Sequence, residues 1–292
     1  MKSLNSLSRR RFLGTGAAGI AGAAFAWTNA RAEKPETGPI DFNGFTVGVQ
    51  SYTFRKFTLE KALDLTRGLG LKYAEFFRQH IPPTSTPEQL KAFKKLLAEY
   101  GIAPIAFGVE RFTKNHDGNK KMFDFGKELG IQHISADPDP DSFDSLDKLV
   151  EEYKISIAIH PHGPAGKNAL HRWYSAEVIM KAVKDHHPLI GTCLDTGHLI
   201  RAAQLGKKLD PAQEIRTMGA RNFGIHLKDH DNEAKRDVIY GKGVLNVPEV
   251  LKALREVKFK GYISIEYEHN PDDPTSDVRE CVAILRDAAK KA

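Results

Sequence analysis

The sequence predicts an α/β protein built as a (β/α)8 barrel in a single domain. Short apolar runs alternate with amphipathic stretches, a pattern that favours parallel strands joined by helices. Eight such runs fit within roughly 250 residues, the strand count and size of a closed barrel, whereas a doubly wound sheet usually has fewer strands. The predicted strands are 45–50, 72–77, 103–109, 131–136, 154–160, 190–195, 222–228 and 261–267.

The first 32 residues predict a signal peptide for export and are set apart from the fold. Residues 8–14 (SRRRFLG) carry a twin-arginine pattern, residues 15–27 form a weakly apolar run, and residues 30–32 (ARA) match a cleavage site. The apolar run is shorter than the ~20 residues that span a bilayer. We therefore expect cleavage after Ala32 and a periplasmic or secreted protein, with an uncleaved membrane anchor as the alternative.

The segments after the signal divide into a linker and the barrel. Residues 33–42 (EKPETGPIDF) are rich in proline and charge and predict a linker, which leaves residues 43–292 for the barrel domain. Helix signals support this domain. Thr86 is placed to cap a helix that ends before Gly101, and residues 247–249 and 274–277 open two later helices.

The charge balance argues against a nucleic-acid partner. Five of the 43 basic residues and none of the 37 acidic residues lie in the first 32 positions, so the mature chain keeps 38 basic and 37 acidic residues. A near-neutral protein lacks the basic surface that phosphate contacts need. We expect no nucleic-acid partner and no membrane partner after cleavage, while a homo-oligomer stays open. The two cysteines are too few for a disulfide framework.

Side-chain parity selects one polar residue at the end of each of four strands. Alternate side chains of a barrel strand face the helices and the interior. In residues 154–160 the three isoleucines face outward, so His160 faces inward at the carboxyl end. The same alternation on the later strands places one inward polar residue at the carboxyl end of each strand, where such barrels keep their active sites. Together with His160, these residues are Asp195, His226 and Glu266.

Two imidazoles and two carboxylates at one level predict a site for one divalent metal ion. Charged groups gathered in a protected cavity need a compensating charge or a shifted protonation state. Mixed nitrogen and oxygen ligands suit Mn, Co, Zn, Fe or Ni, and suit Mg less well because imidazole is softer than Mg prefers. A hydrogen-bonded polar plug is the alternative interpretation of these residues.

Several motifs resemble those of the xylose isomerase-like TIM barrel family, which contains sugar isomerases and epimerases. The carriers are CLDTGH (193–198), GIHLKDHD (224–231), the GKG turn (241–243) and ISIEYEH (263–269), and the resemblance extends over about residues 45–290. It implies a TIM barrel and a metal-dependent enzyme that acts on a small carbohydrate. The family commonly has a glutamate where this chain has His160, so an exchange of protons between two ligand carboxylates is not available to Glu266 alone.

Further candidates for proton transfer and substrate binding lie near the predicted ligands. The resemblance implies that His198 holds a substrate oxygen or binds a second metal; helix capping or packing is its alternative. His162 is a candidate ligand, acid/base or loop residue, and Lys228 could polarise a carbonyl or form a salt bridge. Glu75 and Glu110 are alternative bases for which ion pairing is favoured. Aromatic rings that could stack on a sugar are Tyr52, Phe54 and Trp173.

The predicted function is that of a metal-dependent isomerase or epimerase acting on a sugar or keto-sugar through an enediolate. Chelation of adjacent oxygens by the cation lowers the pKa of the neighbouring C–H, and a base, Glu266 or another group, removes that proton. A 3-keto-glycoside lyase or hydratase at the same metal site is the alternative. A non-catalytic sugar-binding barrel and a phosphodiesterase resembling apurinic endonucleases are weaker interpretations.

Overall fold

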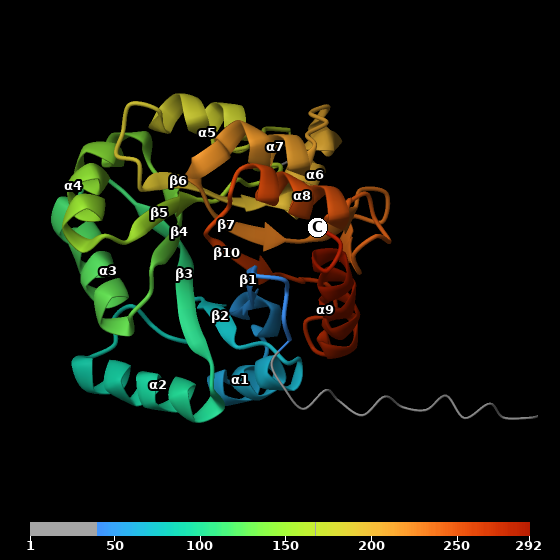
Figure 1. Cartoon of the computed structure of the whole chain (residues 1–292). Coiled ribbons are helices and arrows are strands. Elements are labelled where there is room, and N and C mark those ends of the chain that lie inside the picture. Colours follow the sequence, from blue (N-terminus) through green and yellow to red (C-terminus); the bar gives the residue numbers. More distant parts are fainter. Residues whose placement is uncertain (1–39, 167) are drawn as a thin grey trace, which may run out of the picture. The chain divides into compact units, whose positions relative to one another are not determined.

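The computed structural model describes residues 40–166 and 168–292, so the predicted signal peptide and most of the predicted linker lie outside the described residues. Eight parallel strands close into a barrel surrounded by helices (Figure 1). The predicted fold class is therefore confirmed. Among the described residues, no helix has the length and apolar character required to cross a membrane.

The barrel strands coincide with the eight predicted runs to within three residues at each end. They are β1 (Thr46–Gln50), β2 (Tyr73–Phe76), β3 (Ala103–Phe112), β4 (His133–Pro138), β5 (Ser156–Ile159), β6 (Ile190–Asp195), β7 (Asn222–Leu227) and β10 (Tyr262–Ile265). Their order around the barrel is β1-β10-β7-β6-β5-β4-β3-β2, so β10 closes the barrel against β1.

Helices connect the strands on the outside of the barrel. They are α1 (Leu59–Gly68), α2 (Pro87–Tyr100), α3 (His116–Leu129), α4 (Phe143–Tyr153), α5 (Ala176–Val183), α6 (Thr196–Arg201), α7 (Pro211–Met218), α8 (Val247–Glu256) and α9 (Thr275–Ala289). The predicted start and end signals of α2 are confirmed. Thr86 and Gln89 form a reciprocal capping box, and Gly101 ends the helix in the left-handed conformation with φ 68°.

The alternation of side chains divides the core as the sequence predicts. Isoleucines and leucines at the outward positions pack against the helices in one large hydrophobic cluster. The interior holds a second, small cluster around Tyr262, whose ring lies among Ala106, Ala158 and Cys193. The Tyr262 hydroxyl and the Ser135 hydroxyl are hydrogen-bonded at 2.9 Å, so the centre of the barrel is filled by a satisfied polar group.

The GKG turn is held by a single buried carboxylate. A short hairpin, β8 (Asp229–Asp231) and β9 (Arg236–Val238), follows β7, and the Asp229 side chain accepts five backbone hydrogen bonds. Its donors are the N–H groups of His230, Gly241, Gly243, Val244 and Leu245. A Cβ at Gly243 would lie 2.3 Å from Asp229 Oδ1, which explains why this position is glycine.

Candidate metal centre and active site

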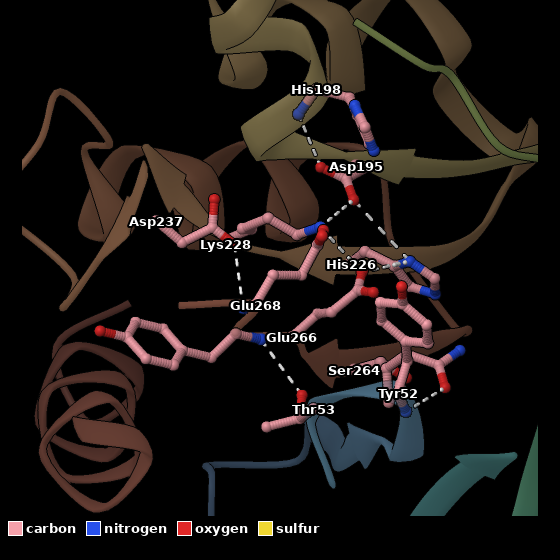
Figure 2. A network of polar contacts seen from close by, with 12 residues as sticks. Tyr52, Thr53, Asp195, His198, His226, Lys228, Asp237, Ser264, Glu266 and Glu268 are labelled. Atoms are coloured by element: carbon pink, nitrogen blue, oxygen red, sulfur yellow. Dashed lines mark hydrogen bonds and ion pairs between the residues drawn. The ribbon is translucent and has the colours of Figure 1, made fainter. Parts of the chain in front are cut away.

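The four predicted ligands meet at the carboxyl end of the barrel. One ligand atom from each of His160, Asp195, His226 and Glu266 lies within 4.8 Å of the other three, and all four residues are buried. His160 follows β5, Asp195 ends β6, His226 lies on β7 and Glu266 follows β10. Figure 2 shows the Asp195 and Glu266 carboxylates directed toward His226 and Lys228.

The spacing of these atoms fits a common cation. His160 Nε2 lies 3.0 Å from His226 Nδ1 and 3.3 Å from Asp195 Oδ2, and His226 Nδ1 lies 3.0 Å from Glu266 Oε2. Ligands at metal bond lengths of about 2.1 Å are separated by roughly 3.0 to 3.4 Å at octahedral and tetrahedral angles. The described ligand set therefore forms a potential metal-binding cluster.

Two buried oxygens in this cluster accept no hydrogen bond. They are Asp195 Oδ2 and Glu266 Oε2, each fully enclosed by protein. Buried carboxylate oxygens without hydrogen-bond donors need a compensating positive charge, which the Lys228 ammonium supplies at 3.2 Å from each and to which a bound cation could add. The two oxygens of Asp195 have different roles. Oδ1 accepts the backbone N–H of His198 at 2.7 Å and caps α6. One oxygen thus fixes the helix while the other stays available to a cation.

A buried carboxylate from the opposite wall fixes the orientation of His226. The His226 Nε2–H donates to Glu75 Oε2 at 2.8 Å, so Nδ1 is the nitrogen that faces the cluster. The hydroxyls of Ser135 and Ser264 also donate to Glu75, at 2.5 and 2.8 Å. Burial would raise the pKa of Glu75, but His226 and these hydroxyls hold it below its usual value. Glu75 is structural in this arrangement, as the ion-pair interpretation predicts.

A second group of three imidazoles shares His160 with the first. Its other members, His162 and His198, also have nitrogens within 4.8 Å of one another. His198 Nδ1 accepts the backbone N–H of Gly163 at 2.9 Å, so Nε2 must carry the proton of the neutral ring. A protonated nitrogen cannot bind a metal, so this group suits a hydrogen-bond donor better than a second metal site.

His162 stands behind the ligand His160. The two Nδ1 atoms lie 3.4 Å apart, and because His160 Nε2 faces the cluster, its Nδ1 carries the proton and points to His162. Burial, with a smaller effect of His160, lowers the pKa of His162 to about 3, so the ring stays neutral and accepts this contact. Its remaining nitrogen then carries a proton.

Lys228 forms the salt bridge that the sequence leaves open as an alternative. Its buried Nζ lies 3.2 Å from Asp195 Oδ2 and 3.2 Å from Glu266 Oε2, and it is hydrogen-bonded to Glu268. Burial would raise the pKa of Glu266, but Lys228 and His226 lower it to about 2. Burial and Lys228 likewise act in opposite directions on the pKa of Asp195, and the ammonium holds it well below the usual range. Both carboxylates are therefore ionised at neutral pH.

A cavity of about 470 Å³ opens onto the ligand cluster. Its lining brings together seven of the predicted site residues, which are Tyr52, His160, His162, His198, His226, Glu266 and the alternative base Glu110. Asp195 and Lys228 are buried and are not part of the lining of this cavity.

Two predicted substrate contacts require correction. Trp173 is 4% exposed, packs edge-on against Phe143 and donates its indole N–H to the Pro138 carbonyl at 2.9 Å. Phe54 is fully buried in the outer hydrophobic cluster. Neither ring lines the cavity, because apolar burial against the helices outweighs exposure at the mouth. Tyr52, which is 38% exposed, is the ring of this trio that faces the site.

The sequence interpretation did not single out several lining residues. Arg78 and Gln79 follow β2, Gln50 ends β1, and Glu268 lies two residues beyond Glu266. The Arg78 guanidinium donates to both oxygens of Glu110, through Nε at 3.2 Å and Nη2 at 2.5 Å. The sequence feature that could have identified these lining residues is their position at or just beyond the carboxyl end of a strand, where barrels of this class carry their functional loops.

Comparisons by sequence connect the chain with two inosose dehydratases at low identity. It is 25% identical over 231 residues to an inosose dehydratase of Geobacillus thermodenitrificans, covering 73% of this chain and 74% of the relative. An inosose dehydratase of Bacillus cereus is 24% identical over 281 residues, covering 85% and 89%. The chain also covers 48%, about half the length, of an uncharacterised protein of Methanocaldococcus jannaschii, at 27% identity over 149 residues.

Solved structures share the fold over nearly their full length. An uncharacterised protein from Parabacteroides distasonis is 30% identical with a TM-score of 0.64, covering 83% of this chain and 98% of that one. The 3-keto-D-glucoside 4-epimerase from E. coli has a TM-score of 0.64 at 14% identity and covers 83% and 99%, which shows a shared fold. The profile of one family matches residues 63–288, most of the described barrel. The chain therefore belongs to the xylose isomerase-like TIM barrel family.

Proposed function

We propose that the protein is a metal-dependent lyase that removes a proton next to the carbonyl of a sugar or keto-sugar and eliminates the oxygen substituent of the adjacent carbon. One observation carries this choice. Of the two carboxylates in the ligand cluster, Glu266 alone lines the cavity, and the rest of the cluster's exposed surface consists of imidazoles. Glu110 and Glu268 also line the cavity, but they are paired with Arg78 and Lys228. One ligand carboxylate facing N–H donors suits elimination better than a symmetrical exchange of protons between two carboxylates.

The cluster formed by His160, Asp195, His226 and Glu266 is the proposed binding site of one divalent cation. When bound there, the cation would polarise a carbonyl oxygen of the substrate and so acidify the neighbouring C–H. The metal identity is a matter for measurement, and the donor set favours Mn, Co, Zn, Fe or Ni over Mg. Glu75 keeps His226 in the required tautomer from the far side of the barrel.

Proton movement follows from the groups that line the cavity. The Glu266 carboxylate takes the proton from the carbon next to the carbonyl, and the electron pair of that C–H bond forms a C=C bond. The bond from the adjacent carbon to its oxygen substituent breaks, and that oxygen takes the proton now held by Glu266, while the neutral His162 ring donates an N–H hydrogen bond to it. His198 donates its Nε2–H to a substrate oxygen and holds the ring in place. Lys228 keeps Glu266 ionised before the reaction.

The comparisons support the substrate class and the reaction class of this proposal. The inosose dehydratase relatives carry a lyase name, and the 3-keto-D-glucoside 4-epimerase carries the name of a keto-sugar substrate. Both names denote keto compounds, in which the C–H bonds next to the carbonyl are acidic. We carry over this shared feature and leave the individual substrates with those proteins.

Isomerisation or epimerisation, the first expectation from the sequence, is the second candidate. It is favoured by Glu268, another carboxylate in the lining of the same cavity, although Lys228 binds it. Incubation of metal-loaded protein with free sugars and 3-keto-glycosides in deuterated water, followed by NMR, separates the outcomes. Elimination products without epimers support the lyase, deuterated epimers support the second candidate, and binding without any proton exchange rejects both.

Glu266→Gln tests the central residue. The amide keeps the shape of the side chain but loses the charge that binds a cation and accepts a proton, so we expect activity to fall by at least a thousandfold and bound metal to fall in elemental analysis. Glu280→Gln, which changes an exposed carboxylate on α9 paired with Lys242, is the matched control. Full activity of Glu266→Gln would exclude the assigned role.

We propose export through the twin-arginine pathway on the basis of residues 1–32. A folded, metal-loaded enzyme suits a route that carries folded proteins. Replacing Arg9 and Arg10 together by lysine should keep the precursor in the cytoplasm, and the exported wild-type protein should begin at Glu33 by N-terminal sequencing. Export of the doubly substituted chain at the wild-type level would contradict this proposal.

A further inference from the structure

A cavity of about 510 Å³ opens at the amino end of the barrel, opposite the ligand cluster. Its lining includes His133, Ser156 and Asn222, which begin β4, β5 and β7, and Gly261, which precedes β10. The ligand cluster lies at the other ends of the strands, and the buried Tyr262 ring fills the interior between. The volume is within the ~300–1,000 Å³ of small-molecule sites. A ligand in this cavity would not occupy the place of a substrate at the ligand cluster.

The charged side chains that line this cavity are all lysines. They are Lys154, Lys258 and Lys260, and no aspartate or glutamate accompanies them in the lining. Lys154 is paired with Glu151, which lies outside the lining. Within the described part of the chain, neither Lys258 nor Lys260 has an ion-pair partner. Ammonium groups of one sign gathered at a cavity raise the local concentration of anions, so this lining favours an anionic ligand.

Two of these lysines have a backbone conformation that favours glycine. Lys154, directly after α4, and Lys258, two residues after α8, each have φ 55°. At the corresponding turns after α2 and α3 the chain has Gly101 and Gly130, with φ 68° and 85°. A residue with a Cβ is less stable than glycine in this left-handed conformation. Backbone stability alone would favour glycine at both turns, so the lysine side chains, which meet at one cavity, account better for these positions.

Much of the remaining lining is apolar and partly exposed. Leu189, Phe223, Val257 and Phe259 are half-buried around the cavity. The Phe223 ring is stacked with His133, with the ring centroids 6.2 Å apart and the planes 19° from parallel. Flat and aliphatic surfaces of this kind pack against a ligand with a flat apolar body.

Two uncharged polar side chains of the lining are already hydrogen-bonded within the protein. The Ser156 hydroxyl and His133 Nδ1 lie 2.7 Å apart. The Asn222 amide donates to the carbonyls of Ile215 and Gly219, at 2.8 and 2.9 Å. Because these groups are satisfied, binding in the cavity depends mainly on apolar contact and on the lysine ammonium groups.

We propose that this cavity binds a small organic anion with a flat apolar body, of the class of aromatic carboxylates, with its charge beside Lys258 and Lys260. An inorganic anion would match the lysines without contacting the rings, and a neutral aromatic compound would match the rings without compensating the lysines. The site is independent of the proposed lyase reaction, because no residue of the ligand cluster lines it.

Calorimetric titration with three probes tests the two features of the ligand separately. The probe 2-naphthoate carries both a charge and an apolar body, 2-naphthamide lacks the charge, and inorganic phosphate lacks the apolar body. We expect one 2-naphthoate to bind per chain with a Kd below about 1 mM, and the other two probes to bind at least tenfold more weakly. Absence of 2-naphthoate binding, or equal binding of either other probe, would overturn the inference.

Lys258→Gly separates binding from folding, because glycine suits the left-handed backbone at this position. The variant should unfold at a urea concentration no lower than the wild type, yet bind 2-naphthoate at least fivefold more weakly. Lys235→Gly is the matched control, since Lys235 also has a positive φ of 52° but lies outside the cavity. Unchanged binding by Lys258→Gly, or an equal loss in both variants, would overturn the inference.

Glu266→Gln checks that the probe does not bind at the ligand cluster. This variant changes the opposite end of the barrel and should bind 2-naphthoate with the wild-type affinity. Loss of binding in Glu266→Gln would place the anion at the ligand cluster and would also overturn the inference, while leaving the lyase proposal in place.

Discussion

At the scale of single residues, Lys228 shapes the ligand cluster more than the sequence indicates. Its ammonium lies 3.2 Å from one oxygen of each ligand carboxylate and competes with any cation for both. Burial would lower the pKa of this lysine, but Asp195 and Glu266 raise it well above its usual value, so it stays charged. The protein thereby keeps two buried carboxylates compensated at close range.

Lys228→Met should bind a divalent cation at least tenfold more tightly than the wild type. Removing a like charge about 3 Å from the ligand oxygens removes a repulsion of several kcal/mol at protein-like dielectric values. Activity should fall, because Glu266 and Glu268 lose the group that orients them. Competition with a chromophoric chelator measures the affinity. Lys242→Met, which removes an exposed lysine paired with Glu280, serves as the control. Unchanged or weaker metal binding by Lys228→Met would contradict the competition between Lys228 and the cation for the two carboxylates.

At the scale of elements, β7 and β10 meet through a glycine and a tyrosine. A Cβ on Gly224 would lie 2.5 to 2.8 Å from the Tyr262 ring, which fills the barrel interior. Gly224→Ala should therefore destabilise the protein by about 1 to 3 kcal/mol, the usual cost of overpacking. Urea denaturation measures this change. Gly68→Ala on α1, where a Cβ meets nothing within 4 Å, should be neutral or slightly stabilising, and equal effects would argue against a tight interior.

His133 on β4 links stability to pH. Burial lowers its pKa to about 4, while its Nδ1 and the Ser156 hydroxyl are hydrogen-bonded at 2.7 Å. The unfolded chain, with a histidine pKa near 6.5, binds the proton first, so stability is lost as pH falls from about 6.5 to 4. This linkage amounts to a loss on the order of 3 kcal/mol.

His133→Asn removes the titrating ring and should make the decline in stability with falling pH shallower. Urea midpoints of the wild type and the variant at pH 7.0, 5.5 and 4.5 measure the difference. Parallel declines in the two proteins would show that other groups dominate the acid sensitivity.

At the scale of the whole molecule, one bound cation would tie together four strands from the second half of the chain. The ligands follow or end β5, β6, β7 and β10, so binding to the folded state alone should stabilise the entire barrel. At a free metal concentration near 100 times Kd, the gain is about 2.7 kcal/mol, or roughly 5 to 10 °C in Tm for a domain of this size. Calorimetry with and without EDTA should show this difference, and Glu266→Gln should show little of it.

The alternation of apolar runs with amphipathic stretches was sufficient to predict the barrel, and the alternation of side chains along each strand was sufficient to predict which polar residues meet at its carboxyl end. Outward isoleucines on β5 and β10 fix which neighbours face inward, and this parity placed His160 and Glu266 at one level. Closure of eight parallel strands then requires the strand ends to meet, because their carboxyl ends share one edge.

Tertiary packing determines long-range contacts and burial, which the alternation of side chains along a strand does not predict. The contact of Glu75 with His226 spans 151 positions, and the burial of Trp173 depends on where a long loop folds back. The Arg78–Glu110 pair and the cavity over the ligand cluster likewise arise where separate loops meet. The sequence by itself determined the strands and the inward residues, because side chains alternate between the two faces of a strand with a period of two residues. Only the tertiary structure decided tautomers, ion pairs and the shape of the cavity, because these depend on distances between segments that no local pattern encodes.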